Sequence, residues 1–198
     1  IGQTIPWGIG KTRDTLSSTL AGNGAGSVAG VNIRVIDTGI AAHPDLNLVR
    51  HTNFTGDGTN ADCNGHGTHV AGTIGARDDA ASVVGMAPGV ALTGVKVLGC
   101  SGSGSTSTVI KGVDWVTANA VKPAVANMSL GGGVSTMLDN AIVRSVNSGV
   151  VYAIAAGNSA VDACSQSPAR VGRTLAGAIT VAATDSTDAE ASFSNYGS

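Results

Sequence analysis

The chain has 198 residues, of which 42% are hydrophobic and 12% charged, and its net charge is −2. This length suits one domain with a sizeable core. No apolar run approaches the roughly 18–20 residues of a membrane-spanning helix, and no basic block is present, so neither a membrane nor a nucleic acid is an expected partner. The sequence begins at an isoleucine without a signal segment, and we expect a processed product or an excised piece.

Short apolar runs alternate with helical patterns along the chain. Strands are predicted at 31–36, 91–97, 123–128, 150–155 and 178–182. Helices are predicted at 66–76, 106–119 and 135–148. Strands that are apolar nearly throughout and separated by helices are typical of a parallel sheet with both faces covered. The pattern therefore predicts an α/β fold with three layers and a mostly parallel central sheet.

Polar or glycine-rich segments follow three of these strands. Asp37 follows the first strand, Ser129-Leu130-Gly131 follows 123–128, and Asn158 follows 150–155. In open parallel sheets the working residues gather beyond the carboxyl ends of the strands. We therefore expect a functional site at this edge of the sheet.

Two residues near this edge have the chemistry of an acid–base relay. Asp37 closes an apolar strand, and His66 opens a predicted helix within Asn64-Gly-His-Gly-Thr-His-Val-Ala-Gly72. Such a pair matches the orienting acid and the general base of a serine hydrolase. Taken alone, Asp37 is also typical of a turn, and His66 of a helix cap or an exposed imidazole. Their combination and order favour the relay.

The other histidines give weaker signals. His66 and His69 form His-x-x-His on one helix face, but no glutamate stands beside the first and no third zinc ligand is in reach. We expect His69 to be a buried, hydrogen-bonded core residue, and His43 and His51 to lie in loops. Asn158 is interpreted either as an ordinary turn residue or as an amide donor for a developing oxyanion.

At these residues the chain resembles the subtilisin-type serine peptidases, or subtilases. The matching segments are Asp37-Thr-Gly-Ile40, Asn64–Gly72, Asn127-Met-Ser-Leu-Gly-Gly132 and Ala155-Ala-Gly-Asn158. They are long, in order and correctly spaced, and the resemblance extends from about residue 3 to the end of the sequence. It implies a subtilisin-like three-layer fold and one catalytic domain over residues 1–198, incomplete at its C-terminus.

The resemblance also implies a role for individual residues. Asp37 would orient the imidazole, His66 would be the general base and Asn158 the oxyanion donor. An extended protein or peptide substrate would pair with backbone on both sides of a groove, a mode in which main-chain hydrogen bonds hold the peptide. The pairing residues would be Gly102, Ser103 and Gly104 on one side and Ser129, Leu130 and Gly131 on the other. Further expected partners are a propeptide or a protein inhibitor, and the expected state is a monomer.

A calcium site is implied by the segment from Arg77 to Gly85, which resembles a calcium loop found in many subtilases. Oxygen ligands that include two carboxylates suit a structural Ca²⁺ ion. The implied ligands are the side chains of Gln3, Asp45 and Asp79 and the carbonyl groups of Arg77, Ala81 and Val83. The alternative is a solvated acidic loop that binds no ion.

The three cysteines point to a subgroup. Their positions resemble those of extracellular, proteinase K- and aqualysin-like subtilases, which implies a disulfide between Cys63 and Cys100 and a secreted protein. Cys164 would then pair with a cysteine beyond the printed sequence. Free thiols are the alternative, since spacing alone fixes no distance.

One family segment is missing from the printed sequence. The subtilase nucleophile block, Gly-Thr-Ser-Met-Ala, does not occur, and no serine here has a comparable context. We therefore expect a secreted serine endopeptidase whose nucleophilic serine lies outside the printed residues. Two alternatives remain, namely a non-catalytic module of the same fold that holds peptides without cleaving them, and an enzyme that transfers the acyl group to an acceptor other than water.

Overall fold

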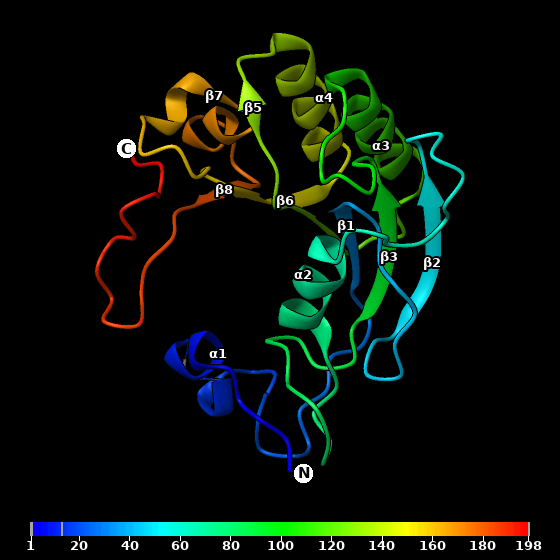
Figure 1. Ribbon diagram of the computed structural model, residues 1–198, viewed down its shortest axis with the longest axis vertical. Coiled ribbons are helices and arrows are strands. Elements are labelled where there is room, and N and C mark those ends of the chain that lie inside the picture. The colour runs from blue at the N-terminus through cyan, green and yellow to red at the C-terminus, as the bar shows by residue number, and fades with distance from the viewer. Residues whose placement is uncertain (1, 13, 198) are drawn as a thin grey trace.

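The computed structural model describes residues 2–12 and 14–197. Within them the chain forms a layered α/β structure around a six-stranded parallel sheet (Figure 1). The sheet contains β1 (Asn32–Asp37), β2 (Leu48–Asn53), β3 (Ala91–Lys96), β4 (Ala124–Met128), β6 (Val150–Ala155) and β8 (Ala178–Val181). The other elements are α1 (Trp7–Lys11), α2 (His66–Gly75), α3 (Thr106–Asn119), α4 (Thr136–Asn147), β5 (Gly132–Gly133) and β7 (Gln166–Ser167), with short 3₁₀ turns at 14–16, 163–165 and 169–173.

The order of the strands brings three polar loops to one edge. The sheet order is β2-β3-β1-β4-β6-β8, so β1 lies between β3 and β4. Its last residue, Asp37, pairs with Lys96 at the end of β3. Because parallel strands all end at the same edge, the loops after β1, β4 and β6 are neighbours there. These loops carry Thr38, Ser129 and Asn158.

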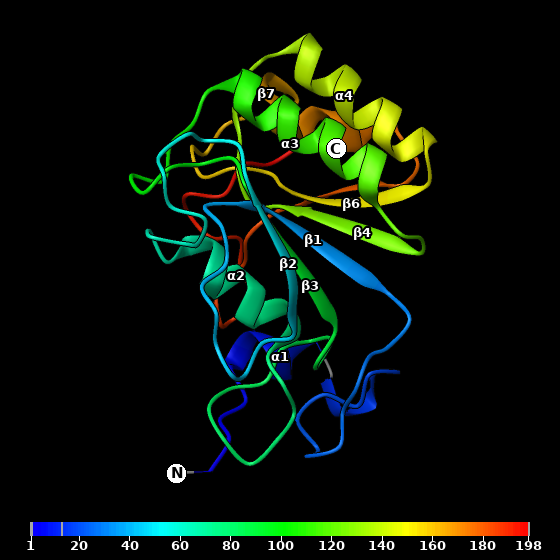
Figure 2. The same ribbon diagram turned by 90° about the vertical axis from the view of Figure 1, so that its right-hand side faces the viewer.

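Helices lie on both faces of the sheet. The views in Figures 1 and 2 place α3 and α4 on one face and α2 on the other. Successive side chains of a strand point to opposite faces, and β1 shows the consequence. Ile36 packs in a cluster with residues of α3 and α4, whereas Val35 packs in a second cluster with Ala71 of α2. The central strand is therefore buried from both sides.

Local sequence explains where α3 and α4 begin. Ser105 precedes α3, and its hydroxyl accepts a hydrogen bond from the backbone N–H of Thr108. Ser135 precedes α4 and accepts in the same way from Leu138. Serine caps of this kind satisfy N–H groups that have no partner inside the helix. Both helices then bury their apolar stripes against the sheet.

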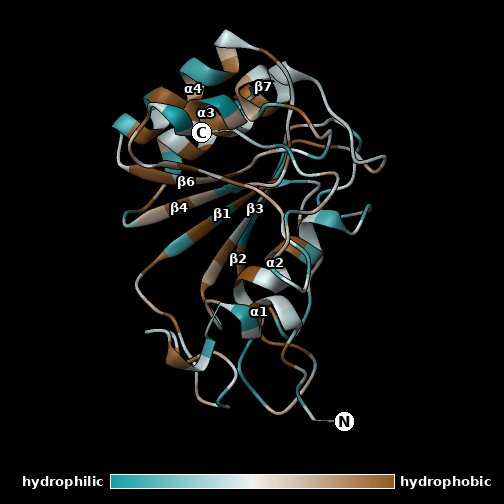
Figure 3. Ribbon diagram, turned by 90° about the vertical axis from the view of Figure 1, so that its left-hand side faces the viewer, coloured by the Kyte–Doolittle hydropathy of each residue, from teal (hydrophilic) through white to brown (hydrophobic). Residues whose placement is uncertain are grey.

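Part of the α2 face of the sheet is not covered by any described helix. Val151 of β6 and Ile179 and Val181 of β8 are 43%, 59% and 54% exposed. Their strand neighbours Tyr152 and Ala178, which point to the opposite face, are buried. Figure 3 shows hydrophobic stretches along β6. An apolar sheet face next to the functional edge is thus open to solvent in the described residues.

The predicted fold class is confirmed, and the predicted strands and helices all occur with ends shifted by at most a residue or two. The sequence patterns missed β2, because Leu48–Asn53 is mostly polar and forms an edge strand that pairs only with β3. The expectation that His51 lies in a loop is therefore wrong. Among the described residues, no helix is long and apolar enough to span a bilayer.

Candidate active site

Asp37 ends the central strand β1 and its side chain is fully buried. The backbone N–H of Thr38 donates a hydrogen bond of 2.7 Å to its Oδ1 atom. The other oxygen, Oδ2, has no hydrogen-bond partner among the described residues. A buried carboxylate held in this way has a fixed orientation, which is what an orienting acid requires.

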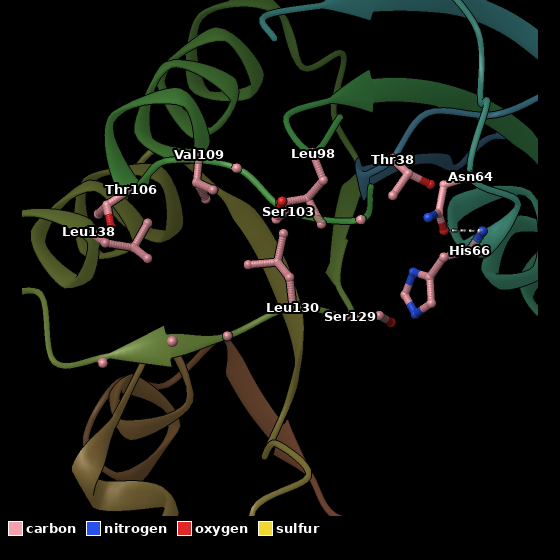
Figure 4. A pocket seen from close by; sticks show the side chains of 15 residues that line it. Thr38, Asn64, His66, Leu98, Ser103, Thr106, Val109, Ser129, Leu130 and Leu138 are labelled. Atoms are coloured by element: carbon pink, nitrogen blue, oxygen red, sulfur yellow. Dashed lines mark hydrogen bonds between the residues drawn. The ribbon is translucent and has the colours of Figure 1, made fainter. Parts of the chain in front are cut away.

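His66 is the first residue of α2 and contacts Asp37 directly. Its Nδ1 atom lies 2.7 Å from Asp37 Oδ1. Because an ionised carboxylate only accepts hydrogen bonds, this contact places the imidazole proton on Nδ1 and leaves Nε2 free as a base. The His66 side chain is 49% exposed and lines a groove together with Ser129 (Figure 4). The pair therefore combines a buried acid with an accessible base.

The groove beside His66 has a volume of about 410 Å³. All six predicted substrate-binding residues line it, namely Gly102, Ser103 and Gly104 on one side and Ser129, Leu130 and Gly131 on the other. Apolar side chains lie between these two rims, as Figure 4 shows for Leu98, Val109, Leu130 and Leu138. The structure thus brings together two segments that are far apart in the sequence and forms an apolar channel between them.

Asn158 lies in the loop after β6, and its side chain is exposed. Asn195 holds this loop in place. It is buried, its Nδ2 donates to the carbonyl of Ala156 at 2.8 Å, and its Oδ1 accepts from the N–H of Ser159 at 2.9 Å. At Gly157 a Cβ atom would lie 2.3 Å from Asn195 Nδ2. Glycine is therefore needed for the close contact that fixes the loop carrying Asn158.

Lys96 is a fully buried cation below the site. Its ammonium group donates to the carbonyl groups of Thr38 at 2.9 Å and Leu98 at 3.1 Å, and it forms an ion pair of 3.2 Å with Asp57. The pKa of Asp57 is lowered to about 2 by a backbone hydrogen bond from Thr59, by side-chain hydrogen bonds and by Lys96, against a smaller opposing effect of desolvation. Lys96 thereby ties the loop after β1 to the loop after β2.

The predicted disulfide between Cys63 and Cys100 is present, with the two Cα atoms 4.9 Å apart. It joins the segment just before α2 to the segment just before the Gly102 rim, so it connects two walls of the site. Cys164 has a free thiol and is partly buried.

The prediction for His69 is wrong. Its side chain is exposed and lines a hollow on the outer side of α2 rather than lying in the core. The physical reason is that no described segment packs over this face of the helix. His66 and His69 also share no third ligand in the described part of the chain, and Nδ1 of His66 is already bonded to Asp37.

The residues of the predicted calcium site come from three segments that lie side by side. Gln3 Nε2 donates to the carbonyl of Arg77 at 3.0 Å, and the N–H of Arg77 donates to the carbonyl of Asp45 at 3.0 Å. The neighbouring Thr4 pairs with Val83 in a parallel β-bridge. Asp79 lies on the loop between Arg77 and Val83 and accepts from the N–H of Ala81 at 2.8 Å. All six predicted ligands therefore belong to one compact region.

Comparison with known proteins identifies the family. The model of the subtilase family matches residues 29–198. The chain belongs to the subtilase family. It is 54% identical over 180 residues to an extracellular serine proteinase of Thermus sp., an alignment that covers 85% of this chain and 40% of that protein. It is 43% identical over 197 residues to subtilisin Savinase of Lederbergia lenta, covering 98% of this chain and 69% of that protein.

A solved structure shows the same fold. The crystal structure of a cold adapted subtilisin-like serine proteinase superposes with a TM-score of 0.76 at 51% sequence identity, over 85% of this chain and 60% of that one. The chain therefore spans about two fifths of the first relative and three fifths of this structural neighbour. The subtilisin-like fold predicted from the sequence is confirmed by this superposition.

Sequence reasoning missed several polar residues that hold the subtilase site together. Asp62, Lys96 and Asn195 form hydrogen bonds that hold the segments around Asp37, His66 and Asn158. Asp62 precedes α2, Lys96 ends an otherwise apolar strand, and Asn195 lies near the end of the sequence. A lysine that closes an apolar strand was the one detectable signal, because a buried charge requires a partner.

Proposed function

We propose that this chain is the larger part of a catalytic domain of a secreted serine endopeptidase. The bond of 2.7 Å between Asp37 and His66, at the end of an apolar groove, is the observation that carries the proposal. Nδ1 of His66 donates to Asp37, so Nε2 can take a proton from a serine hydroxyl. The nucleophilic serine lies outside the printed residues.

The reaction would proceed through an acyl-enzyme. The serine oxygen attacks the scissile carbonyl carbon while His66 Nε2 accepts the hydroxyl proton, and Asp37 stabilises the imidazolium ion that forms. His66 then protonates the leaving amine, and water hydrolyses the ester. Asn158 would donate to the oxyanion, a contribution of about 10²–10³-fold in rate that is known for the corresponding asparagine of a subtilisin.

The groove supports protein or peptide substrates. Its two rims are backbone-rich segments around Ser103 and Leu130, and Gly102 and Gly104 keep one rim free of bulky side chains. An extended peptide placed between the rims can form main-chain hydrogen bonds on both sides. The apolar side chains of Leu98, Val109 and Leu138 would favour apolar substrate residues in the channel. A propeptide or a protein inhibitor would occupy the same groove.

The uncovered sheet face indicates where the polypeptide that carries the nucleophilic serine would pack. Exposed apolar side chains of β6 and β8 lie on the same face as α2, which carries His66. Apolar surface of this kind favours burial by additional polypeptide. We infer that the segment which covers this face also delivers the serine to His66, and that residues 1–198 form one catalytic domain only together with it.

Secretion and a monomeric state belong to the same proposal. The relative from Thermus is named an extracellular proteinase, and the Cys63–Cys100 disulfide is typical of an oxidising compartment. No second chain is needed to complete the contacts between Asp37, His66 and the groove.

The predicted calcium site fits the residues present. Asp45 is only 8% exposed and lines the same hollow as Ser82 and Val83 of the loop after α2. Carboxylate, amide and carbonyl oxygens are the ligands that calcium prefers. The side chains of Gln3, Asp45 and Asp79 and the carbonyls of Arg77, Ala81 and Val83 would hold the ion. The bound ion would supply charge neutralisation that ties the N-terminal segment to the loop after α2.

Chelation tests the calcium site. Excess EGTA should lower the melting temperature of the wild type, because an ion that binds only the folded state stabilises it. Excess EGTA should lower the melting temperature of Asp78→Asn by as much as it lowers that of the wild type, because Asp78 is not a predicted ligand. Its carboxylate instead accepts hydrogen bonds from the N–H groups of Gly22 and Gly26. Asp79→Asn should melt at one temperature with or without chelator. Unchanged melting of the wild type in excess chelator would remove the site.

Peptide hydrolysis tests the enzymatic function in the full-length protein that contains this chain. His66→Ala should lower kcat about 10⁶-fold and Asp37→Asn about 10⁴-fold, magnitudes known for the corresponding residues of a subtilisin. Asp188→Asn, which changes an exposed carboxylate paired with Lys11, is the control and should retain activity. Hydrolysis by His66→Ala at the wild-type rate would contradict the proposal. Tight peptide binding by a wild type that does not cleave would favour the non-catalytic module.

A further inference from the structure

Asp62 stands between the disulfide and α2, and its carboxylate accepts five hydrogen bonds. Oδ1 accepts from the N–H groups of Asn64 and Gly65 and from the hydroxyl of Thr38, each at 2.9 Å. Oδ2 accepts from the N–H of Thr68 at 2.9 Å and from its hydroxyl at 2.5 Å. One side chain thus contacts the loop after β1 and the first turn of α2.

The two threonines bonded to Asp62 link these elements in both directions. Thr38 belongs to the loop after β1, and its hydroxyl accepts from the N–H of Gly67 in α2 at 2.9 Å. Thr68 belongs to α2, and its hydroxyl accepts from the N–H of Ala41 in the loop at 2.9 Å. Because each hydroxyl donates its only proton to Asp62, each is oriented to accept across the junction. Without the carboxylate, neither threonine hydroxyl would be held in the orientation in which it accepts across the junction.

Asp62 also takes the place of a helix cap. Gly65 precedes α2 with a φ of 103° and provides no side-chain cap. The first N–H groups of a helix need acceptors, and a carboxylate near them is further favoured by the helix dipole. Burial acts to raise the pKa of Asp62, but the hydrogen bonds from Thr68, Gly65 and Asn64 outweigh it and lower this pKa to about 2. The group is therefore an anion at neutral pH.

The same junction carries the two catalytic residues. Thr38 follows Asp37, and its N–H donates to the oxygen that bonds His66. His66 lies between Gly65, which donates to Asp62, and Gly67, which donates to Thr38. We propose that Asp62 is a positioning residue that holds Asp37 and His66 at bonding distance by joining the loop after β1 to the start of α2. The inference rests on the proposed function, because it concerns the efficiency of that relay.

This role predicts an effect on turnover rather than on substrate binding. Asp62 does not line the substrate groove, and it faces the hollow on the other side of α2. A misplacement of about 1 Å between reacting groups is enough to lower a rate about 10²-fold. Loss of Asp62 should therefore lower kcat and leave KM nearly unchanged.

A pH profile separates this role from a purely structural one. Removing an anion near the start of α2 makes the imidazolium form of His66 less favourable, so the active neutral form persists to lower pH. The acid limb of the profile of kcat/KM should therefore move to lower pH in Asp62→Asn. The other titratable or charged groups near this junction are Asp37, Asp45, Asp57, Lys96, His43, His51 and His69.

The experiment compares Asp62→Asn with wild type in the full-length enzyme, with active sites counted by fluorophosphonate titration. We expect kcat per titrated site to fall about 10-fold or more with KM within about 2-fold, and the acid limb to shift downward. Asp185→Asn is the matched control, since Asp185 also accepts bonds from a threonine and from backbone N–H groups but lies in a remote loop. The control should match wild type in all three values. Asp62→Asn with wild-type kcat and an unmoved limb would overturn the inference.

Two further measurements decide the inference if Asp62→Asn does not fold or if the wild type proves inactive. Thr68→Val removes the hydroxyl that bonds Asp62 and Ala41, whereas Thr68→Ser keeps it, so kcat should fall in the first and recover in the second. Equal kcat in both would overturn the inference. The low-field NMR resonance of the His66 Nδ1 proton needs no turnover, and its loss in Thr68→Val but not in Thr68→Ser supports the inference. A wild type that is not labelled by the fluorophosphonate and does not hydrolyse peptides would contradict the proposed function but not the inference about Asp62.

Discussion

At Gly67, helix α2 lies in very close contact with the loop that follows β1. A Cβ atom added there would lie 2.1 Å from the carbonyl oxygen of Gly39 and 3.2 Å from Cβ of Asp37. Because Gly39 is backbone, the contact cannot be relieved by a side-chain rotation. In Gly67→Ala the helix and the loop must therefore move apart by roughly 1 Å, the size of displacement that costs about 10²-fold when it falls on reacting groups.

Helix propensity predicts the opposite outcome for this substitution. Alanine is favoured over glycine inside a helix by about 1 kcal/mol, so a free position in α2 would gain stability. We expect Gly67→Ala instead to lose about 1–3 kcal/mol in the free energy of unfolding, as overpacked sites do. Activity should fall about 10²-fold in kcat/KM for a chromogenic peptide, because the bond between Asp37 and His66 lengthens.

Gly8→Ala in α1 is the control for this prediction. A Cβ atom at Gly8 meets nothing within 4 Å. This variant should keep its activity and unfold with a free energy unchanged or raised by up to about 1 kcal/mol. If Gly67→Ala retains kcat/KM within about 3-fold of wild type while its active sites titrate fully, the reasoning from close approach is refuted.

Three other predictions concern stability. Replacing both Cys63 and Cys100 by serine should lower the free energy of unfolding by about 4 kcal/mol, because the disulfide closes a loop with a sequence separation of 37 residues; urea unfolding measures this, and a loss near zero would contradict it. Tyr152→Phe should cost about 1 kcal/mol, since the buried hydroxyl bonds Ser145 Oγ at 2.7 Å, and urea unfolding at neutral pH checks it. The depressed pKa of Asp62 adds stability that is present above its unfolded value of 3.8 and is lost as pH falls toward about 2, so Asp62→Asn should lose less stability than wild type between pH 5 and pH 3; equal losses would argue against it.

The sequence predicted those parts of the structure that carry periodic or ordered signals. Strands such as 150–155 are apolar throughout, and the helices have apolar residues at regular spacing. Asp37 and His66 could be paired because one closes a buried strand and the other opens a helix, positions that a parallel sheet brings to the same edge. The Cys63–Cys100 pairing came from the resemblance to a subgroup and not from spacing.

Features that depend on long-range packing could not be predicted in this way. β2 is polar because its side chains make specific contacts, such as Arg50 against the ring of Trp115 at 4.6 Å. The hydrogen bond between Thr38 and Asp62 spans 24 residues, and that between Asn195 and Ala156 spans 39. No local sequence pattern predicts either of them. His69 was expected to be a buried, hydrogen-bonded core residue, and it is exposed because no described segment covers its face of the helix.

The central claim is that Asp37 and His66 activate a serine supplied by polypeptide outside the printed sequence. Mapping the residue labelled by a fluorophosphonate in the protein isolated from its source tests it most directly. We predict a single labelled serine beyond residue 198, with labelling abolished in His66→Ala. Labelling of a serine within the printed sequence, or labelling of His66→Ala at the wild-type rate, would contradict the claim.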